Sequence, residues 1–167
     1  LERDPDEPEI FLYMDVSANT KEEMNAKTKL IRQILSDAKK RGVAFEEPME
    51  IQTLLRVNPA FSRFAEFPTT LDFLLDHPGG GLTWVGSYGP TAKWEEGSRR
   101  GFEIMERAGF PPVLVSRPMK GGHFGVLRFI MIFDKNNPEE VRKVHETNQN
   151  IADMLLEIGF IPYKAPV

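Results

Sequence analysis

The spacing of hydrophobic residues changes along this chain, and each change predicts a different kind of element. Strict alternation over residues 9–16 predicts a strand whose second face is also partly covered. Apolar residues then recur at helical spacing over 20–41, directly after a capping box formed by Thr20 and Glu23. Lysine and arginine in the last turn, followed by Gly42, end this helix. The chain therefore begins with a strand and a long helix.

Six further elements are predicted between residue 79 and the end of the sequence. A short apolar run, Leu82–Tyr88, carries glycine on both sides and predicts a central strand whose backbone something else approaches closely. The other predicted elements are a helix over 91–108, strands over 113–117 and 124–133, a helix over 138–158 and a strand over 160–164. The order β-α-β-β-α-β is that of a ferredoxin-like unit.

These elements predict an α+β fold, a ferredoxin-like antiparallel sheet with helices packed on one face. The opposite face would carry Trp84, Tyr88 and one set of side chains from 113–133. Residues 1–8, which are acidic and contain two prolines, are interpreted as a linker or a disordered end. We expect one domain over 9–167, with a first half at 9–78 and the ferredoxin-like unit at 79–167.

The segment from Val43 to His77 is ambiguous. Residues 49–57 suit either a strand or a helix, and 70–76 predicts a short helix. Four phenylalanines fall in this segment and either pack short helices together or form an aromatic wall of a ligand pocket: Phe61, Phe64, Phe67 and Phe73.

Composition excludes several classes of function. The chain has 167 residues, 41% of them hydrophobic, and a net charge of −4, which offers no basic surface for nucleic acid. It contains no cysteine, so disulfides and thiol chemistry are excluded. No apolar run approaches a membrane span and no signal peptide is present, so we expect a cytoplasmic protein without membrane contact. The three histidines match no metal-site spacing.

Two positions in the predicted hairpin are candidates for chemistry. His123 follows two glycines at the turn and is either a solvent-exposed turn residue or a mobile base or substrate contact. Arg128 lies inside an otherwise apolar strand. It is either a side chain that reaches from the open sheet face into solvent, or a fixed cation that stabilises an anion.

A phenol and an ammonium group stand next to each other near the end of the chain, at Tyr163 and Lys164. Neighbouring strand residues point to opposite faces unless the strand is ending. At a strand end both side chains could reach one ligand. The alternative is that Tyr163 packs at the sheet edge while Lys164 is solvated.

The second half of the chain resembles the cap domain of the vanillyl-alcohol oxidase / 4-cresol dehydrogenase family of flavoproteins. The resemblance is carried by Leu82–Val85, by Glu106-Arg-Ala-Gly109, by Met131-Ile-Phe-Asp-Lys-Asn-Asn-Pro138 and by Gly159-Phe-Ile-Pro-Tyr-Lys164. These segments span about half of the chain in the same order and spacing. The earlier run Ala18-Asn-Thr-Lys-Glu-Glu23 is similar to the preceding part of the same cap.

The resemblance implies a substrate-binding cap of an enzyme that uses FAD to remove hydride from a para-substituted phenol or a similar alcohol, with hydroxy acids as a further substrate class. In that family a Tyr-Arg pair binds the phenolate oxygen, and Tyr163 with Lys164 occupies its place here. The candidate substrate-binding residues are therefore Tyr163 and Lys164, which the resemblance implies, together with Trp84, Arg128 and His123, which the sequence pattern suggests.

The resemblance also implies how the cofactor is held. Some members attach FAD covalently through a histidine just before the central strand, where this chain has Gly81, or Gly80 if the register slips by one. FAD is therefore expected to touch Gly80 and Gly81 without a covalent bond. It would be held mainly by a separate FAD-binding domain of the same polypeptide, of which this chain would be a fragment.

A second interpretation is a free-standing ferredoxin-like module that binds a ligand or dimerises and has no redox activity. A homodimer is compatible with both interpretations. A flavin domain encoded directly upstream would favour the first interpretation, and a start codon before residue 1 with a stop after Val167 would favour the second.

Overall fold

The structure, a computed structural model, describes residues 12, 14, 16–57, 59, 75, 77–119 and 121–164, without the side chains of Leu54, Val57 and Lys164. The chain divides into two compact units, Leu1–Leu54 and Leu55–Val167. The division lies within a short helix, upstream of the boundary at residue 79 that the sequence indicated. The second unit contains the sheet and carries the candidate site.

The first unit contains the long helix α1, Lys21–Lys40, which confirms the helix predicted over 20–41. The Thr20 hydroxyl accepts a hydrogen bond from the Glu23 amide at 3.1 Å, as the capping box requires. The Glu23 carboxylate reaches one residue further than expected and accepts from the Asn19 amide at 2.9 Å. None of the residues of α1 is buried.

The ambiguity over 49–57 is resolved as helix α2, Ile51–Val57. The strand predicted over 9–16 falls mostly outside the described residues, and its described members Leu12, Met14 and Val16 belong to no strand. The phenylalanine-rich stretch over 61–73 lies outside the described residues, as does nearly all of the short helix predicted over 70–76.

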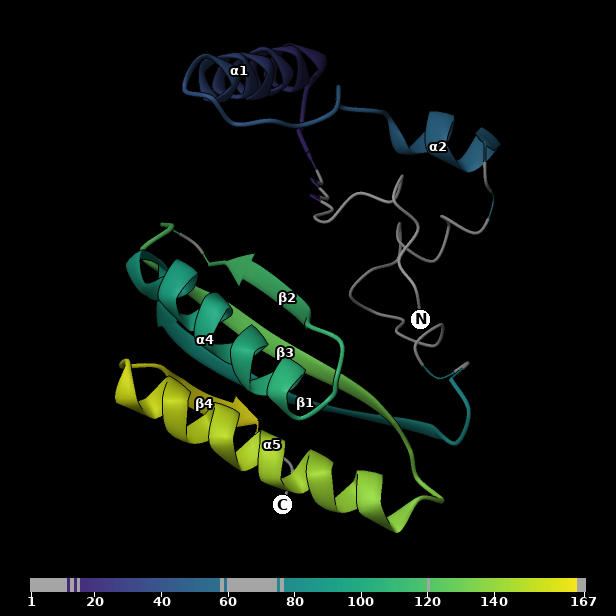
Figure 1. Cartoon of the computed structure of the whole chain (residues 1–167). Helices are drawn as coiled ribbons and strands as arrows, with labels where there is room; N and C mark the ends of the chain where they lie inside the picture. Colours follow the sequence, from purple (N-terminus) through teal and green to yellow (C-terminus); the bar gives the residue numbers. More distant parts are fainter. Residues whose placement is uncertain are drawn as a thin grey trace. The chain divides into compact units, whose positions relative to one another are not determined.

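Four antiparallel strands form the sheet in the described part of the second unit (Figure 1). They are β1 (Gly80–Pro90), β2 (Val113–Pro118), β3 (Phe124–Asp134) and β4 (Ile161–Lys164), in the order β2-β3-β1-β4. The strands β1 and β3 pair along their whole length, from Gly80 opposite Asp134 to Pro90 opposite Phe124. The two longest strands therefore occupy the middle of the sheet, and the shorter β2 and β4 lie at its edges.

Two helices cover one face of the sheet (Figure 1). They are α4 (Trp94–Arg107), which follows the 3-10 turn η3 (Thr91–Lys93), and α5 (Pro138–Glu157). Asn137 caps α5 by accepting from the Glu139 amide at 3.1 Å. The core between helices and sheet includes Val85, Leu127, Phe129 and Met131 from the strands and Met105, Val144, Ile151 and Leu155 from the helices. The predicted α+β fold, with helices on one face of an antiparallel sheet, is confirmed.

Helix α4 packs against the sheet through small residues. Its buried residues are Gly97, Gly101 and Met105. A Cβ atom at Gly101 would lie 2.1 Å from the Phe129 ring. Because these glycines have no side chain, the helix backbone can approach the strand β3 closely. This close packing holds α4 against the sheet.

Candidate functional site

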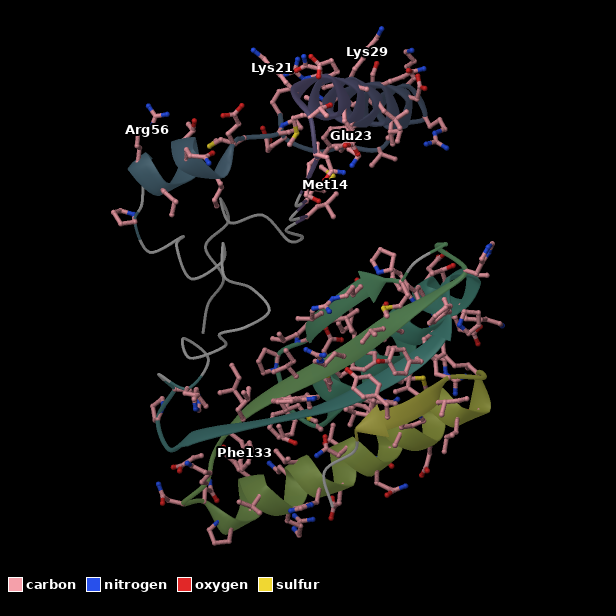
Figure 2. The ribbon with its side chains drawn as sticks, turned by 180° about the vertical axis from the view of Figure 1, so that it is seen from behind. Met14, Lys21, Glu23, Lys29, Arg56 and Phe133 are labelled. Carbon is pink, nitrogen blue, oxygen red and sulfur yellow. The ribbon has the colours of Figure 1, made fainter. Side chains whose placement is uncertain are left out.

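Alternate residues of the central strands point away from the helices, toward the other face of the sheet. Figure 2 views the molecule from the side of that face. Val85, Leu127 and Phe129 pack against the helices, so Trp84, Gly86, Tyr88, Val126, Arg128 and Ile130 belong to the opposite, open face. The sequence predicted Trp84 and Tyr88 on this face, and the alternation places them there.

Arg128 and Tyr163 meet on the open face. The Arg128 Nη2 atom donates a hydrogen bond to the Tyr163 hydroxyl over 2.9 Å. Arg128 belongs to β3 and Tyr163 to β4, and the strand β1 lies between them. Two strand spacings separate the two backbones by roughly 10 Å, which a long guanidinium side chain and a phenol can span only by lying across β1.

Gly86 makes this crossing possible. It pairs with Arg128 on β3 and with Lys164 on β4. A Cβ atom at Gly86 would lie 2.7 Å from both Cζ and Oη of Tyr163, so any side chain there would occupy the space of the phenol. The close approach that the glycines around the central strand predicted is thus made here by Tyr163.

A bulge in the pairing of β1 with β4 directs the tyrosine. Ser87 pairs with Pro162 and Gly86 with Lys164, which leaves Tyr163 as the extra residue between them. A bulge re-aims the side chain of its unpaired residue and bends the strand. The sequence predicted that Tyr163 and Lys164 act together on one ligand. In the structure Lys164 pairs with Gly86 in the sheet, whereas Tyr163 has no pairing partner on β1.

Aromatic rings surround the pair. The Tyr88 and Tyr163 rings lie with their centroids 4.6 Å apart at an angle of 35°. The Arg128 guanidinium carbon lies 5.8 Å from the centroid of the Trp84 ring, within the range of a cation–π contact. Trp84, Tyr88, Arg128 and Tyr163, hereafter the open-face cluster, therefore combine flat apolar surface with hydrogen-bond donors and one positive charge.

The base of the Arg128 side chain is enclosed. Its neighbours on the same face of β3 are Val126, which is 7% exposed, and Ile130, which is 1% exposed. Its Nε atom is buried and has no hydrogen-bond acceptor among the described residues. A buried donor without an acceptor costs about 1–3 kcal/mol, so this position calls for a further partner.

The remaining predicted site residues lie elsewhere or are not described. His123 is exposed at the turn before β3, and its carbonyl oxygen accepts from the Thr91 amide at 3.0 Å. Five residues of strand, roughly 17 Å, separate it from Arg128. The backbone of Lys164 pairs with Gly86, while its side chain lies outside the described part of the structure. The structure thus brings together Trp84, Arg128 and Tyr163 but not His123.

Gly80 and Gly81 begin β1, about 17 Å from Gly86 along the strand. Gly80 has a φ of +55°, which favours glycine. A Cβ atom at Gly81 would lie 2.3 Å from the Phe133 carbonyl oxygen. The neighbouring strand of this chain therefore occupies the space that a side chain at position 81 would need, and strand packing accounts for that glycine without a ligand.

Sequence reasoning missed two members of the site. Tyr88 was assigned to the open face but not to the binding residues, and Gly86 was not singled out. The signal for both was present in the run Val85-Gly-Ser-Tyr88, where residues 86 and 88 share one face. What the sequence lacked was the register that sets Tyr163 over Gly86.

A hollow lies on the outer side of α4 and α5 and is lined by charged residues of both signs. Arg100 lies 2.6 Å from the Glu157 carboxylate on the other helix and 3.7 Å from Glu96. The hydrogen bond from Arg100, followed by its charge, lowers the pKa of Glu157 below its usual value. In contrast to the open-face cluster, this hollow holds an arginine that already has carboxylate partners.

The described residues contain neither a metal-binding cluster nor a membrane-spanning helix. No group of three or more histidine, aspartate or glutamate side chains is placed to hold a metal ion. No helix there has both the length and the apolar character needed to cross a membrane. No protein-family model, curated protein or solved structure matches the chain.

Proposed function

We propose that this chain is the substrate-binding cap of an FAD-dependent oxidase or dehydrogenase that removes hydride from a para-substituted phenol or a similar alcohol. The observation that carries the proposal is the hydrogen bond between Arg128 and Tyr163 on the open face. The family resemblance calls for a phenol group and a cation acting together on one substrate oxygen. Arg128 supplies that cation from the neighbouring region of the sheet, beside the Lys164 position that the resemblance indicates.

The open-face cluster supports a role in binding an oxyanion. Tyr163 can donate its hydroxyl proton to an anionic oxygen while it accepts from Arg128, and the guanidinium charge favours the anion. A hydrogen bond to a charged group contributes about 1.5–3 kcal/mol. A negative charge on a phenolic oxygen raises the electron density that loss of hydride withdraws, so these residues would assist the chemical step as well as binding.

The residues present fit FAD only in part. The flat rings of Trp84, Tyr88 and Tyr163 suit a wall of a substrate cavity, but the glycines at 79–81 lead into and begin the strand β1, whereas phosphate-binding loops precede a helix. We therefore propose that another domain of the same polypeptide binds FAD, which accepts the hydride. The part of this chain is to bind and orient the substrate and to shield the reacting carbon from water.

The first prediction concerns the attachment of the cofactor. In the full open reading frame that encodes this chain, we expect a flavoprotein that releases its FAD on acid precipitation, because Gly81 stands where a linking histidine would be. The measurement is the flavin absorption of the supernatant and the pellet. A yellow pellet with flavin mapped to residues 77–90 would contradict the non-covalent attachment. A purified full-length protein without flavin would contradict the proposed function and favour a binding or dimerisation module.

The second prediction concerns Tyr163. The change Tyr163→Phe removes the hydroxyl and keeps the ring, so we expect flavin reduction in a single turnover to slow by about tenfold or more, corresponding to roughly 1.4 kcal/mol. Ser116→Ala, an exposed hydroxyl on the edge strand β2, is the matched control and should leave the rate unchanged. A reduction rate of Tyr163→Phe within about twofold of the unmodified enzyme would remove Tyr163 from the site.

A further inference from the structure

Arg128 carries a positive charge that no carboxylate neutralises within the described residues. Its contacts there are the hydroxyl of the Tyr163 phenol, at 2.9 Å, and the indole ring of Trp84, whose centroid lies 5.8 Å away. Its Nε–H group is buried and has no acceptor in the part of the chain that the structure describes. Charged groups removed from water are ordinarily paired, because the lost hydration must be replaced. The Arg128 guanidinium is half-buried, its contacts are a phenol and an indole, and its Nε–H group has no acceptor among the described residues. This arrangement indicates that an anion completes the site.

The hydrogen-bond polarity of the pair narrows the choice of anion. Arginine has five N–H donors and no acceptor. Because the Tyr163 oxygen accepts from Arg128, its own proton is free to point elsewhere, and the pair offers two kinds of donor side by side. A carboxylate has two oxygens in one plane and matches a guanidinium fork, whereas a phenolate has one oxygen and engages only part of it.

The side chains around Arg128 and Tyr163 indicate the chemical character of the rest of the ligand. Trp84 and Tyr88 present rings on the same face, and Tyr88 is 39% exposed. Aromatic rings bind flat apolar groups by offset stacking or edge-to-face contact. The open-face cluster thus suits a small organic acid with a flat apolar body whose carboxylate lies against Arg128 and Tyr163.

We propose that the ligand of the open-face cluster is a carboxylate, and that Arg128, more than Lys164, is the cation that binds it. This inference rests on the proposed function in one respect, the class of substrate that the enzyme oxidises. That substrate becomes a hydroxy acid with a flat apolar body instead of a simple phenol. Binding of the carboxylate itself requires no flavin. Gly86 contributes by leaving room for the Tyr163 phenol, whose hydroxyl group lies beside the guanidinium donors of Arg128.

The test compares three probes of the same shape on this 167-residue chain by NMR titration: 4-methylbenzoate, 4-methylbenzamide and 4-methylphenol. We expect 4-methylbenzoate to bind at least tenfold more tightly than the two neutral probes, with the largest shifts at Trp84, Tyr88 and Arg128. Comparable affinity for all three, or preference for the phenol, would overturn the proposal.

Variants assign the effect to Arg128. Arg128→Gln should weaken 4-methylbenzoate binding at least tenfold, and by more than Lys164→Gln does. Arg128→Lys keeps the charge but loses the fork, and should weaken binding several-fold; it also serves if Arg128→Gln fails to fold. The control is Arg117→Gln, an exposed arginine that pairs with Val126 on β3 and lies outside the cluster, which should leave the affinity unchanged.

The outcomes separate this proposal from the proposed function. A full-length protein without flavin, combined with tight and Arg128-dependent benzoate binding, would overturn the redox function and support the carboxylate site. A full-length flavoprotein whose cap shows no preference for the carboxylate would support the redox function and overturn this inference. Weakening by Lys164→Gln alone would assign the cation to Lys164 and overturn the role of Arg128.

Discussion

Replacing Phe129 with alanine is expected to lower the free energy of unfolding of the second unit by about 3–5 kcal/mol. Phe129 has no exposed surface, and its ring meets the Phe102 ring edge-on with centroids 6.3 Å apart. The same ring fills the space above Gly101 of α4. Its removal would leave a cavity between the central strand β3 and the helix layer, which the surrounding backbone cannot fill.

Urea denaturation followed by tryptophan fluorescence measures this change, because Trp84 and Trp94 both belong to the second unit. The matched control is Phe124→Ala on the same strand, where the phenylalanine is 46% exposed and a loss below about 1 kcal/mol is expected. Equal losses at the two positions would contradict the placement of the core on the helix side of β3.

The fold of the second unit could be predicted because its signals are local. The Asn137 cap, the glycines that end the helices and the change from helical to alternating periods each depend on a few neighbouring residues. The order of these elements then restricts the topology, because a ferredoxin-like order places β1 and β3 in the middle of one antiparallel sheet. Boundaries moved by only a few residues, as at Gly80 and Pro90.

The candidate site could be predicted only in part, because it depends on register between distant strands. Trp84, Arg128 and Tyr163 could each be chosen by residue type and face. That Arg128 meets Tyr163 depends on two registers at once, Gly86 opposite Arg128 and Tyr163 bulged beside Gly86. Neither register is encoded in a short motif, so the sequence directed attention to the adjacent Lys164 as the cation.

The close packing of α4 was missed for a related reason. A hydrophobic stripe on a helix predicts which side chains are buried, but glycine contributes nothing to such a stripe. Gly97 and Gly101 are buried because side chains of the sheet cover them. Leu127 and Phe129 occupy the positions that side chains at 97 and 101 would take. Glycines four residues apart on one helix face were the available signal for a close approach to another element.

The two glycines of α4 should respond differently to alanine, although both substitutions raise helix propensity by about 1 kcal/mol. At Gly101 the new Cβ would lie 2.1 Å from Cε1 and 2.2 Å from Cζ of the Phe129 ring, which is held inside the core. Overpacking of this kind costs about 1–3 kcal/mol, so Gly101→Ala should lower the free energy of unfolding by up to about 2 kcal/mol after the propensity gain is subtracted.

At Gly97 the nearest atoms are the terminal methyl carbons of Leu127, at 2.9 Å, and Ile158, at 3.3 Å. Such methyl groups can move by rotation, so Gly97→Ala should leave the unfolding free energy unchanged or raise it by up to about 1 kcal/mol. The double variant Gly101→Ala/Phe129→Leu replaces the ring that causes the clash. It should be less destabilised than the sum of its single variants by about 1 kcal/mol, measured in the same urea titrations. Equal effects of alanine at positions 97 and 101, or strict additivity with Phe129→Leu, would show that the α4 backbone does not rest on the Phe129 ring.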